Sequence, residues 1–231
     1  MDKRGKLIVI DGSDGSGKAT QTKLLYQRLK KEGIRVHTLD FPRYEDNMMG
    51  KLIGECIAGA HGDFLHSDPY VASVLYAADR FESKTQIQEW LFDGHIVVLD
   101  RFVSANQIHQ GGKIAHPKKR KTFLKWLERM EYGVFGLPKP DFTIYLCMPI
   151  GFSIQLLQNS APKKRGYLKK GAKDTVEMDI QYMKNAQKSA ELLMKENRSW
   201  HKIVCAEGNT ILPREVIHEK VYACAKKHIR V

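Results

Sequence analysis

The chain alternates short apolar runs with longer stretches in which apolar residues recur every three or four positions. Five of the runs are rich in β-branched residues and show no alternation of apolar and polar positions, which is typical of strands buried on both faces of a parallel sheet. These runs are Lys6–Ile10, Arg35–Leu39, His95–Leu99, Phe142–Cys147 and Lys202–Cys205. The pattern therefore predicts a five-stranded parallel sheet.

Helical periodicity fills the segments between the runs. The first helix is predicted from Lys18 to about Glu32, where Gly33 ends it, and Asp68-Pro69 opens a long helix that runs to about Phe92. Further helices are expected at 48–58, 118–129, 152–157, 174–196 and 213–227. Strands alternating with helices predict an α/β fold, a P-loop three-layer sandwich with a five-stranded parallel sheet flanked by helices. The length of 231 residues suits a single domain over 1–231.

Residues Gly12 to Lys18 read G-S-D-G-S-G-K directly after the first strand, and this is the pattern of a P-loop that binds nucleotide phosphates. Its glycines let backbone N–H groups turn toward phosphate oxygens, and the following helix presents its positive end. Ala19 stands where Ser or Thr normally offers a hydroxyl to Mg²⁺, and Thr20 follows one place further on as an alternative ligand. The predicted ATP-binding residues are Gly12, Ser13, Asp14, Gly15, Ser16, Gly17, Lys18, Ala19 and Thr20.

Charged and aromatic residues follow two other strands and one helix face. Asp100-Arg101 ends the third strand, where a carboxylate can hold Mg²⁺ or its waters and a guanidinium can bind a phosphate with two parallel hydrogen bonds. Such a pair also occurs as a structural ion pair, and this alternative stays open. Phe41-Pro42-Arg43-Tyr44 ends the second strand. Tyr76 and Arg80 lie one helical turn apart, where a core ring and a surface cation are the alternative roles.

These motifs, taken in order, resemble those of one family. The P-loop, Phe41–Arg43, Tyr76–Arg80 and Asp100–Gln110 occur in the order and approximate spacing found in thymidylate kinases, and the resemblance covers nearly the whole chain. It implies transfer of a phosphoryl group from ATP, as co-substrate, to dTMP with Mg²⁺ as cofactor. It also implies a homodimer, for which the apolar helix predicted at 70–91 would supply the interface.

The resemblance assigns a role to each matched residue. Asp14 would contact the 3′-hydroxyl of the sugar and align the acceptor, while Lys18 would bridge the two phosphates. Tyr76 would stack on thymine, and Arg80 would donate to its exocyclic oxygen and so exclude cytosine. His109 falls where the family often packs an aromatic ring against the sugar, so its polar imidazole weakens the expected preference for deoxyribose. The implied dTMP-binding residues are Asp14, Phe41, Arg43, Tyr76, Arg80, Arg101, Asn106 and His109.

The segment 161–173 is basic and contains no acidic residue. Phosphoryl transfer needs cations around the moving group, and Gly15 stands where some relatives carry an arginine in the P-loop. A lid over about 159–173 is therefore expected to supply the missing cation, with a solvated charge run as the alternative. Arg165 completes the predicted catalytic set with Asp14, Lys18 and Arg101; its basic neighbours are Lys163, Lys164, Lys169, Lys170 and Lys173.

Composition limits the possible partners, location and cysteine chemistry of the protein only in part. The formal charge of +12 indicates anionic partners without choosing between nucleotides and nucleic acid. The charged start of the chain and the lack of a long apolar stretch predict a soluble cytoplasmic protein with no membrane partner. The four scattered cysteines predict neither disulfides nor zinc. The basic stretch 117–121 opens an amphipathic helix, so a solvated helix start is favoured over a nucleic-acid patch.

Two alternative functions stay open at this point. Another nucleoside monophosphate or deoxynucleoside kinase would share the P-loop and the Asp-Arg pair. A P-loop nucleic-acid-binding ATPase would account for the positive charge, although the chain shows no second nucleic-acid module, and no nucleic-acid partner is expected.

Overall fold

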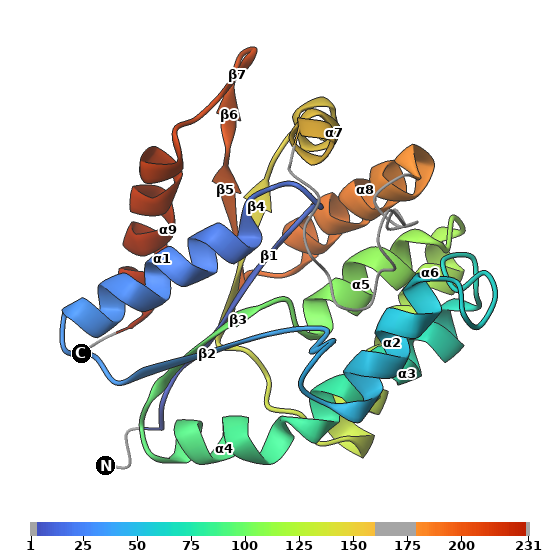
Figure 1. The fold of residues 1–231 in the computed structure, drawn as a ribbon, viewed down its shortest axis with the longest axis horizontal. Coiled ribbons are helices and arrows are strands. Elements are labelled where there is room, and N and C mark those ends of the chain that lie inside the picture. Colours follow the sequence, from blue (N-terminus) through green and yellow to red (C-terminus); the bar gives the residue numbers. More distant parts are fainter. Residues whose placement is uncertain (1–3, 160–178, 230–231) are drawn as a thin grey trace.

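The computed structural model describes residues 4–159 and 179–229 and has a five-stranded parallel sheet at its centre (Figure 1). The order of the strands is β2-β3-β1-β4-β5, and all four pairings are parallel. This confirms the predicted sheet. The strands are β1 (Leu7–Gly12), β2 (Val36–Asp40), β3 (Ile96–Asp100), β4 (Phe142–Cys147) and β5 (Trp200–Val204).

Helices cover both faces of the sheet, as the three-layer prediction requires (Figure 1). One face carries α1 (Lys18–Lys31) and α9 (Arg214–His228), and the other carries α4 (Lys84–Phe92), α5 (Val103–Gly112) and α8 (Ile180–Glu196). The remaining elements are α2 (Met48–Ile57), α3 (Pro69–Glu82), α6 (Pro117–Glu128), the π-helix η1 (Arg129–Val134), α7 (Ile150–Asn159) and the hairpin β6 (Ala206–Glu207) and β7 (Thr210–Ile211). No helix in the described ranges is both long and apolar enough to span a bilayer.

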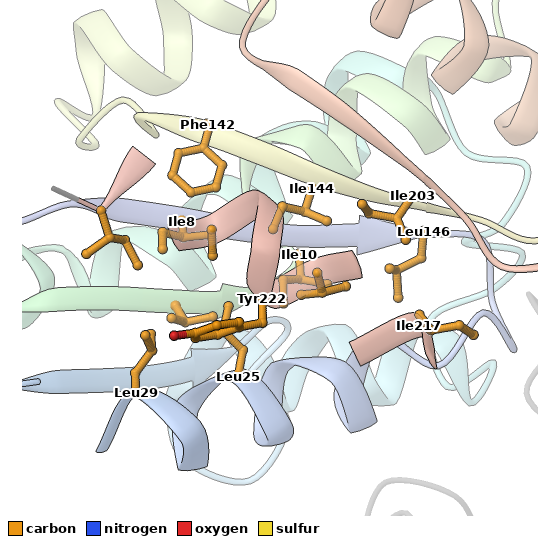
Figure 2. Packing of buried hydrophobic residues seen from close by; sticks show 14 of the residues in the cluster. Ile8, Ile10, Leu25, Leu29, Phe142, Ile144, Leu146, Ile203, Ile217 and Tyr222 are labelled. Atoms are coloured by element: carbon orange, nitrogen blue, oxygen red, sulfur yellow. The ribbon is translucent and has the colours of Figure 1, made fainter. Parts of the chain in front are cut away.

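Alternation along the central strand β1 divides the core between the two faces. Ile8 and Ile10 pack into a cluster with residues of α1 and α9, whereas Leu7 and Val9 belong to the cluster on the α4 side. Figure 2 shows the first cluster, in which Leu25 of α1 and Tyr222 of α9 pack over the strands. Each fully buried Leu or Ile stabilises the fold by about 1.5–3 kcal/mol. The core therefore holds the carboxyl ends of β1 and β3 rigidly side by side.

The predicted single helix over 69–92 is wrong, because the structure divides it at Ser83 into α3 and α4. Ser83 has φ −98° and ψ 0°, and its hydroxyl accepts a hydrogen bond from Arg43 Nη1 at 3.1 Å. After the break the chain changes direction, so that α4 packs against β3 whereas α3 runs at an angle to α4 (Figure 1). Three elements were not predicted: helix α5, the π-helix η1 that continues α6, and the hairpin. Of the predicted helix 174–196, residues 174–178 lie outside the described part of the chain.

Candidate active site

The P-loop connects β1 to α1 and holds its own lysine. Gly15 (φ 79°) and Gly17 (φ 89°) adopt left-handed backbone conformations that residues with a side chain rarely adopt. The Lys18 ammonium donates to the carbonyl oxygens of Gly12 at 3.1 Å and of Ser13 at 2.9 Å. Burial, reinforced by the nearby Arg101, lowers the pKa of Lys18. The ammonium group of Lys18 therefore lies inside the P-loop, where backbone carbonyl oxygens accept its hydrogen bonds.

A second cation lies beside the P-loop because β3 ends next to β1. Arg101 forms an ion pair with Asp14 through Nη2, and its Nη1 donates to Nε2 of His109 at 2.9 Å. Its backbone has φ 64°, an uncommon conformation for a non-glycine residue that aims the guanidinium at the P-loop. The sequence-predicted residues Asp14, Lys18, Arg101 and His109 therefore meet at one point, and Lys18 Nζ lies 3.5 Å from Asp14 Oδ1.

The two cations stabilise the negative charge of Asp14 and disfavour a further positive charge on His109. Burial opposes the charge on Asp14, but Arg101 and Lys18 outweigh it and hold the pKa of Asp14 well below its usual range. Burial and the adjacent Arg101 lower the pKa of His109 to about 4, so the imidazole is neutral at physiological pH. Because Nε2 accepts from Arg101, the proton of neutral His109 sits on Nδ1, which is buried and has no hydrogen-bond partner among residues 4–159 and 179–229. His109 therefore carries a donor that no described residue accepts from.

Asp100, the last residue of β3, is the candidate metal ligand. Its Oδ1 is buried, and no residue in the described part of the chain forms a hydrogen bond with it. Burial raises the pKa of Asp100 to about 6, although Lys18 partly offsets this effect. A carboxylate oxygen without a partner fits the oxygen-ligand preference of Mg²⁺. Ala19 and Thr20 are both exposed on α1. Among the described residues, no three His, Cys, Asp or Glu side chains form a metal-binding group.

Asp11 and Ser104 support the site and were missed by the sequence analysis. Asp11 is fully buried, and its two carboxylate oxygens accept from the Gly12 backbone N–H at 2.8 Å and from the Ser104 hydroxyl at 2.6 Å. The second bond ties the end of β1 to the first turn of α5. An acidic residue directly after the apolar run Leu7–Ile10 was the available signal.

The other wall of the site is built from α3, α5 and η1. Arg80 of α3 is 2% exposed and donates from Nε and Nη2 to Glu131 at 2.8 and 2.6 Å. Asn106 of α5 donates from Nδ2 to Glu131 at 2.8 Å and to the Ser73 carbonyl at 3.1 Å. The structure thus brings the predicted residues Arg80 and Asn106 together through Glu131, which no sequence motif identified. Tyr76 is partly exposed, with its ring 5.8 Å from that of Phe64.

The predicted residues after β2 have different environments. Arg43 donates to Ser83, and its Nη2 lies 3.2 Å from Asp46, while its buried Nε has no partner among the residues that the structure describes. Phe41 is 4% exposed, and its ring packs 5.7 Å from that of Phe102 in the hydrophobic core. In this structure Phe41 anchors the segment that carries Arg43. A direct contact between the Phe41 ring and dTMP stays a prediction.

Helix α7 packs directly onto the P-loop. A Cβ atom on Gly15 would lie 2.6 Å from the Ser153 carbonyl oxygen and 3.1 Å from Leu157 Cγ. The hydroxyls of Ser13 and Ser153 are hydrogen-bonded at 3.0 Å, and Ser153 is fully buried. The loop therefore has no room for a side chain at position 15 in this arrangement. Arg165 and the five lysines of the predicted lid lie outside the described residues.

A P-loop between a central parallel strand and a helix, with an acid and an arginine at the end of the adjacent strand, defines a nucleotide-binding P-loop protein of the α/β class. Comparison with known proteins gives the family. The sequence model of the thymidylate kinase family matches residues 10–219. The chain belongs to this family, whose members are phosphotransferases.

Individual relatives agree with this assignment. A thymidylate kinase of Mycobacterium tuberculosis strain H37Rv is 31% identical over 175 residues, which cover 76% of this chain and 79% of the relative. A protein of Pyrococcus abyssi described as a probable thymidylate kinase is 31% identical over 228 residues, 98% of each chain. The solved structure of thymidylate kinase from Candida albicans superposes with a TM-score of 0.71 at 24% identity, covering 97% of this chain and 92% of that one, and so shares its fold.

Proposed function

We propose that this chain transfers the γ-phosphoryl group of ATP to dTMP and forms dTDP and ADP. The observation that carries the proposal is Arg101, which lies against Asp14 and His109 beside the P-loop lysine. Two fixed cations meet where a donor bound by the P-loop and an acceptor in the adjoining cleft would bring their phosphates together. Family membership supports dTMP as the acceptor.

The chemistry requires alignment and charge neutralisation. A phosphate oxygen of dTMP attacks the γ-phosphorus of ATP, the bond from that phosphorus to the β,γ-bridging oxygen breaks, and ADP leaves without a covalent enzyme intermediate. Lys18 would exchange its two loop carbonyls for phosphate oxygens, and Arg101 would exchange Asp14 for the acceptor phosphate. Asp14, once released, can accept from the sugar 3′-hydroxyl. Arg43 is the second cation proposed for the monophosphate.

Mg²⁺ is part of the proposal. When bound, it would neutralise phosphate charge, and Asp100 would hold it directly or through water with its unpartnered Oδ1. Thr20 is the second candidate, since Ala19 has no ligating group. Removing divalent ions with a chelator should abolish transfer, and titration with Mg²⁺ should restore it.

We further propose that Arg165, in a lid over about 159–173 of a single domain, supplies a cation to the transition state. The crowded position of Gly15 against Ser153 supports a source outside the P-loop. Arg165→Ala should lower the transfer rate and leave dTMP affinity nearly unchanged, which is the signature of a contact made mainly in the transition state. An intact rate after neutralising Arg165 and all five lysines would refute the lid role.

A homodimer in the cytoplasm completes the proposal. Val71, Val74 and Phe81 of α3 are exposed apolar side chains, and their spacing places them near one face of the helix. A second copy of the chain would cover this face. Sedimentation should show a dimer, and Val74→Lys should shift it toward the monomer; a monomeric unmodified protein would contradict the assignment.

The decisive test of the function is a coupled ADP-release assay with dTMP, dUMP, dCMP, UMP and thymidine. The proposal expects efficient use of dTMP and little use of dCMP or thymidine. A different preferred acceptor would indicate another nucleoside monophosphate or deoxynucleoside kinase. ATP hydrolysis that depends on polynucleotide, with steeply salt-dependent binding, would indicate a nucleic-acid-dependent ATPase instead.

A further inference from the structure

We infer that Glu131, a residue outside every recognised motif, is a positioning residue that sets the base preference of the site by orienting Arg80 and Asn106. The inference rests on the proposed function and adds to it a residue that acts through two others. It follows from the hydrogen bonds that the fully buried carboxylate of Glu131 accepts from Arg80 and Asn106, and from the atoms of these two residues that take no part in those bonds.

Glu131 lies in the π-helical turn η1 (Arg129–Val134) and is fully buried. Its Oε2 accepts from Arg80 Nε at 2.8 Å, and its Oε1 accepts from Arg80 Nη2 at 2.6 Å. Two parallel bonds of this kind fix the plane of a guanidinium as well as its position. Since Nε and Nη2 are used, Nη1 is the nitrogen of Arg80 left outside the ion pair for another acceptor.

Glu131 also determines which way the Asn106 amide faces. The Nδ2 group of Asn106 donates to Glu131 Oε1 at 2.8 Å and to the Ser73 carbonyl oxygen at 3.1 Å. In the reversed orientation, the amide oxygen would face two acceptors and neither would receive a hydrogen bond. The carboxylate and the carbonyl therefore hold Oδ1 on the opposite side, and no hydrogen bond within the described ranges reaches that oxygen.

The two unused atoms form a complementary pair. Arg80 lies one turn after Tyr76 on α3, and Asn106 lies one turn before His109 on α5, so both border the proposed dTMP site. Arg80 offers a donor and Asn106 offers an acceptor. On the base-pairing edge, thymine and uracil present a carbonyl oxygen next to a ring N–H donor, whereas cytosine presents an amino donor next to an acceptor ring nitrogen. The pair matches the first pattern and opposes the second.

Loss of the Glu131 carboxylate would weaken the discrimination between thymine and cytosine, although Arg80 and Asn106 would both still be present. An Asn106 amide freed from Glu131 can rotate and offer Nδ2 to the base, and an unpaired Arg80 can leave its plane. A purely structural ion pair makes a different prediction, because its loss would reduce the use of all acceptors to the same extent. The ratio between acceptors therefore separates the two roles.

The test is Glu131→Gln, which keeps the shape of the side chain and replaces one acceptor oxygen with a donor group. Steady-state kinetics are measured with dTMP, dUMP and dCMP. The ratio of kcat/KM for dTMP to that for dCMP should fall by about tenfold or more. The ratio for dTMP to dUMP should hold within about twofold, because these bases share the same edge, and the KM for ATP should also hold.

Glu128→Gln is the matched control. Glu128 lies one turn earlier, and its carboxylate accepts from Gln107 Nε2 at 3.3 Å, so the substitution alters a neighbouring carboxylate that bonds neither Arg80 nor Asn106. Both substrate ratios should stay unchanged in this variant. Thermal unfolding of both variants shows whether the fold is retained.

Two outcomes with Glu131→Gln would overturn the inference: an unchanged ratio of dTMP to dCMP, or an equal loss for all three acceptors. If this variant does not fold, Asn106→Ala is measured on the same panel, and an unchanged ratio of dTMP to dCMP there overturns it as well. Failure of the proposed function is seen separately, since the unmodified protein would then not phosphorylate dTMP.

Discussion

Replacing Gly15 with Ala should destabilise the protein more than the same replacement at Gly33. The two glycines have almost the same backbone conformation, with φ 79° and φ 78°, so Ala meets the same left-handed strain at each position. Their surroundings differ. A Cβ on Gly15 would lie 2.6 Å from the Ser153 carbonyl oxygen, whereas a Cβ on Gly33 would have no atom within 4 Å.

The expected magnitudes follow from these contacts. A non-glycine residue in the left-handed region costs about 1–2 kcal/mol, and this cost applies to both variants. The lower chain entropy of unfolded Ala favours both to the same extent and cancels in the comparison. Gly15→Ala must also displace α7, which endangers the bond between Ser13 and Ser153, worth about 1 kcal/mol. We expect a loss of about 1–2 kcal/mol at position 33 and about 2–4 kcal/mol at position 15.

Urea unfolding without nucleotide measures both free energies, and ATP binding gives a second readout. Gly33→Ala should leave ATP affinity unchanged, while Gly15→Ala should weaken it because the loop and α7 move apart. Equal losses of stability in the two variants would refute the reasoning. That result would mean that α7 yields freely and that the tight contact with the P-loop has no energetic weight.

Three further predictions concern the site. Lys18→Ala and Arg101→Ala should each lower kcat/KM by about a hundredfold or more with the fold retained, since each removes a phosphate-binding cation; near-normal rates would exclude the role. The raised pKa of Asp100, from 3.8 to about 6, means that the native state binds this proton more tightly, so this group lowers stability as pH rises from about 4 to about 6. Asp100→Asn should therefore raise the free energy of unfolding at neutral pH by up to about 3 kcal/mol and slow transfer, and unchanged unfolding curves would contradict the burial argument. His109→Phe removes the unpartnered Nδ1–H donor and should increase the preference for dTMP over its ribonucleotide several-fold in steady-state assays, whereas an unchanged ratio would show that this side chain does not approach the sugar.

The central strands β1, β3 and β4 were predictable because they are buried along almost their whole length and so form nearly uninterrupted apolar runs. Helix α5 could not be predicted, because its buried positions include polar residues: Ser104, Asn106 and Gln107 are buried and form hydrogen bonds to other elements. Its sequence shows a motif and lacks the apolar period of a helix. The helix break at Ser83 could not be predicted either, because the hydrogen bond that Ser83 accepts comes from Arg43, which is distant in the sequence.

The phosphate side of the site was more predictable than the base side. The P-loop and the Asp100-Arg101 pair lie at strand ends, where local sequence fixes their position. Glu131 lies in a π-helical turn, and its role depends on packing of that turn against α3 and α5. No local pattern encodes three elements meeting at one carboxylate.

The stored lysine and the paired arginine also affect which anions the protein can accept. In the structure described, Lys18 is bound by two carbonyl oxygens and Arg101 by Asp14 and His109, so neither cation is an open site for a passing anion. Inorganic phosphate or sulfate offers only charge in exchange for these bonds. A nucleotide adds contacts of its base and sugar to the exchange. The protein is thus expected to stay largely free of the abundant small anions around it and to respond to whole nucleotides.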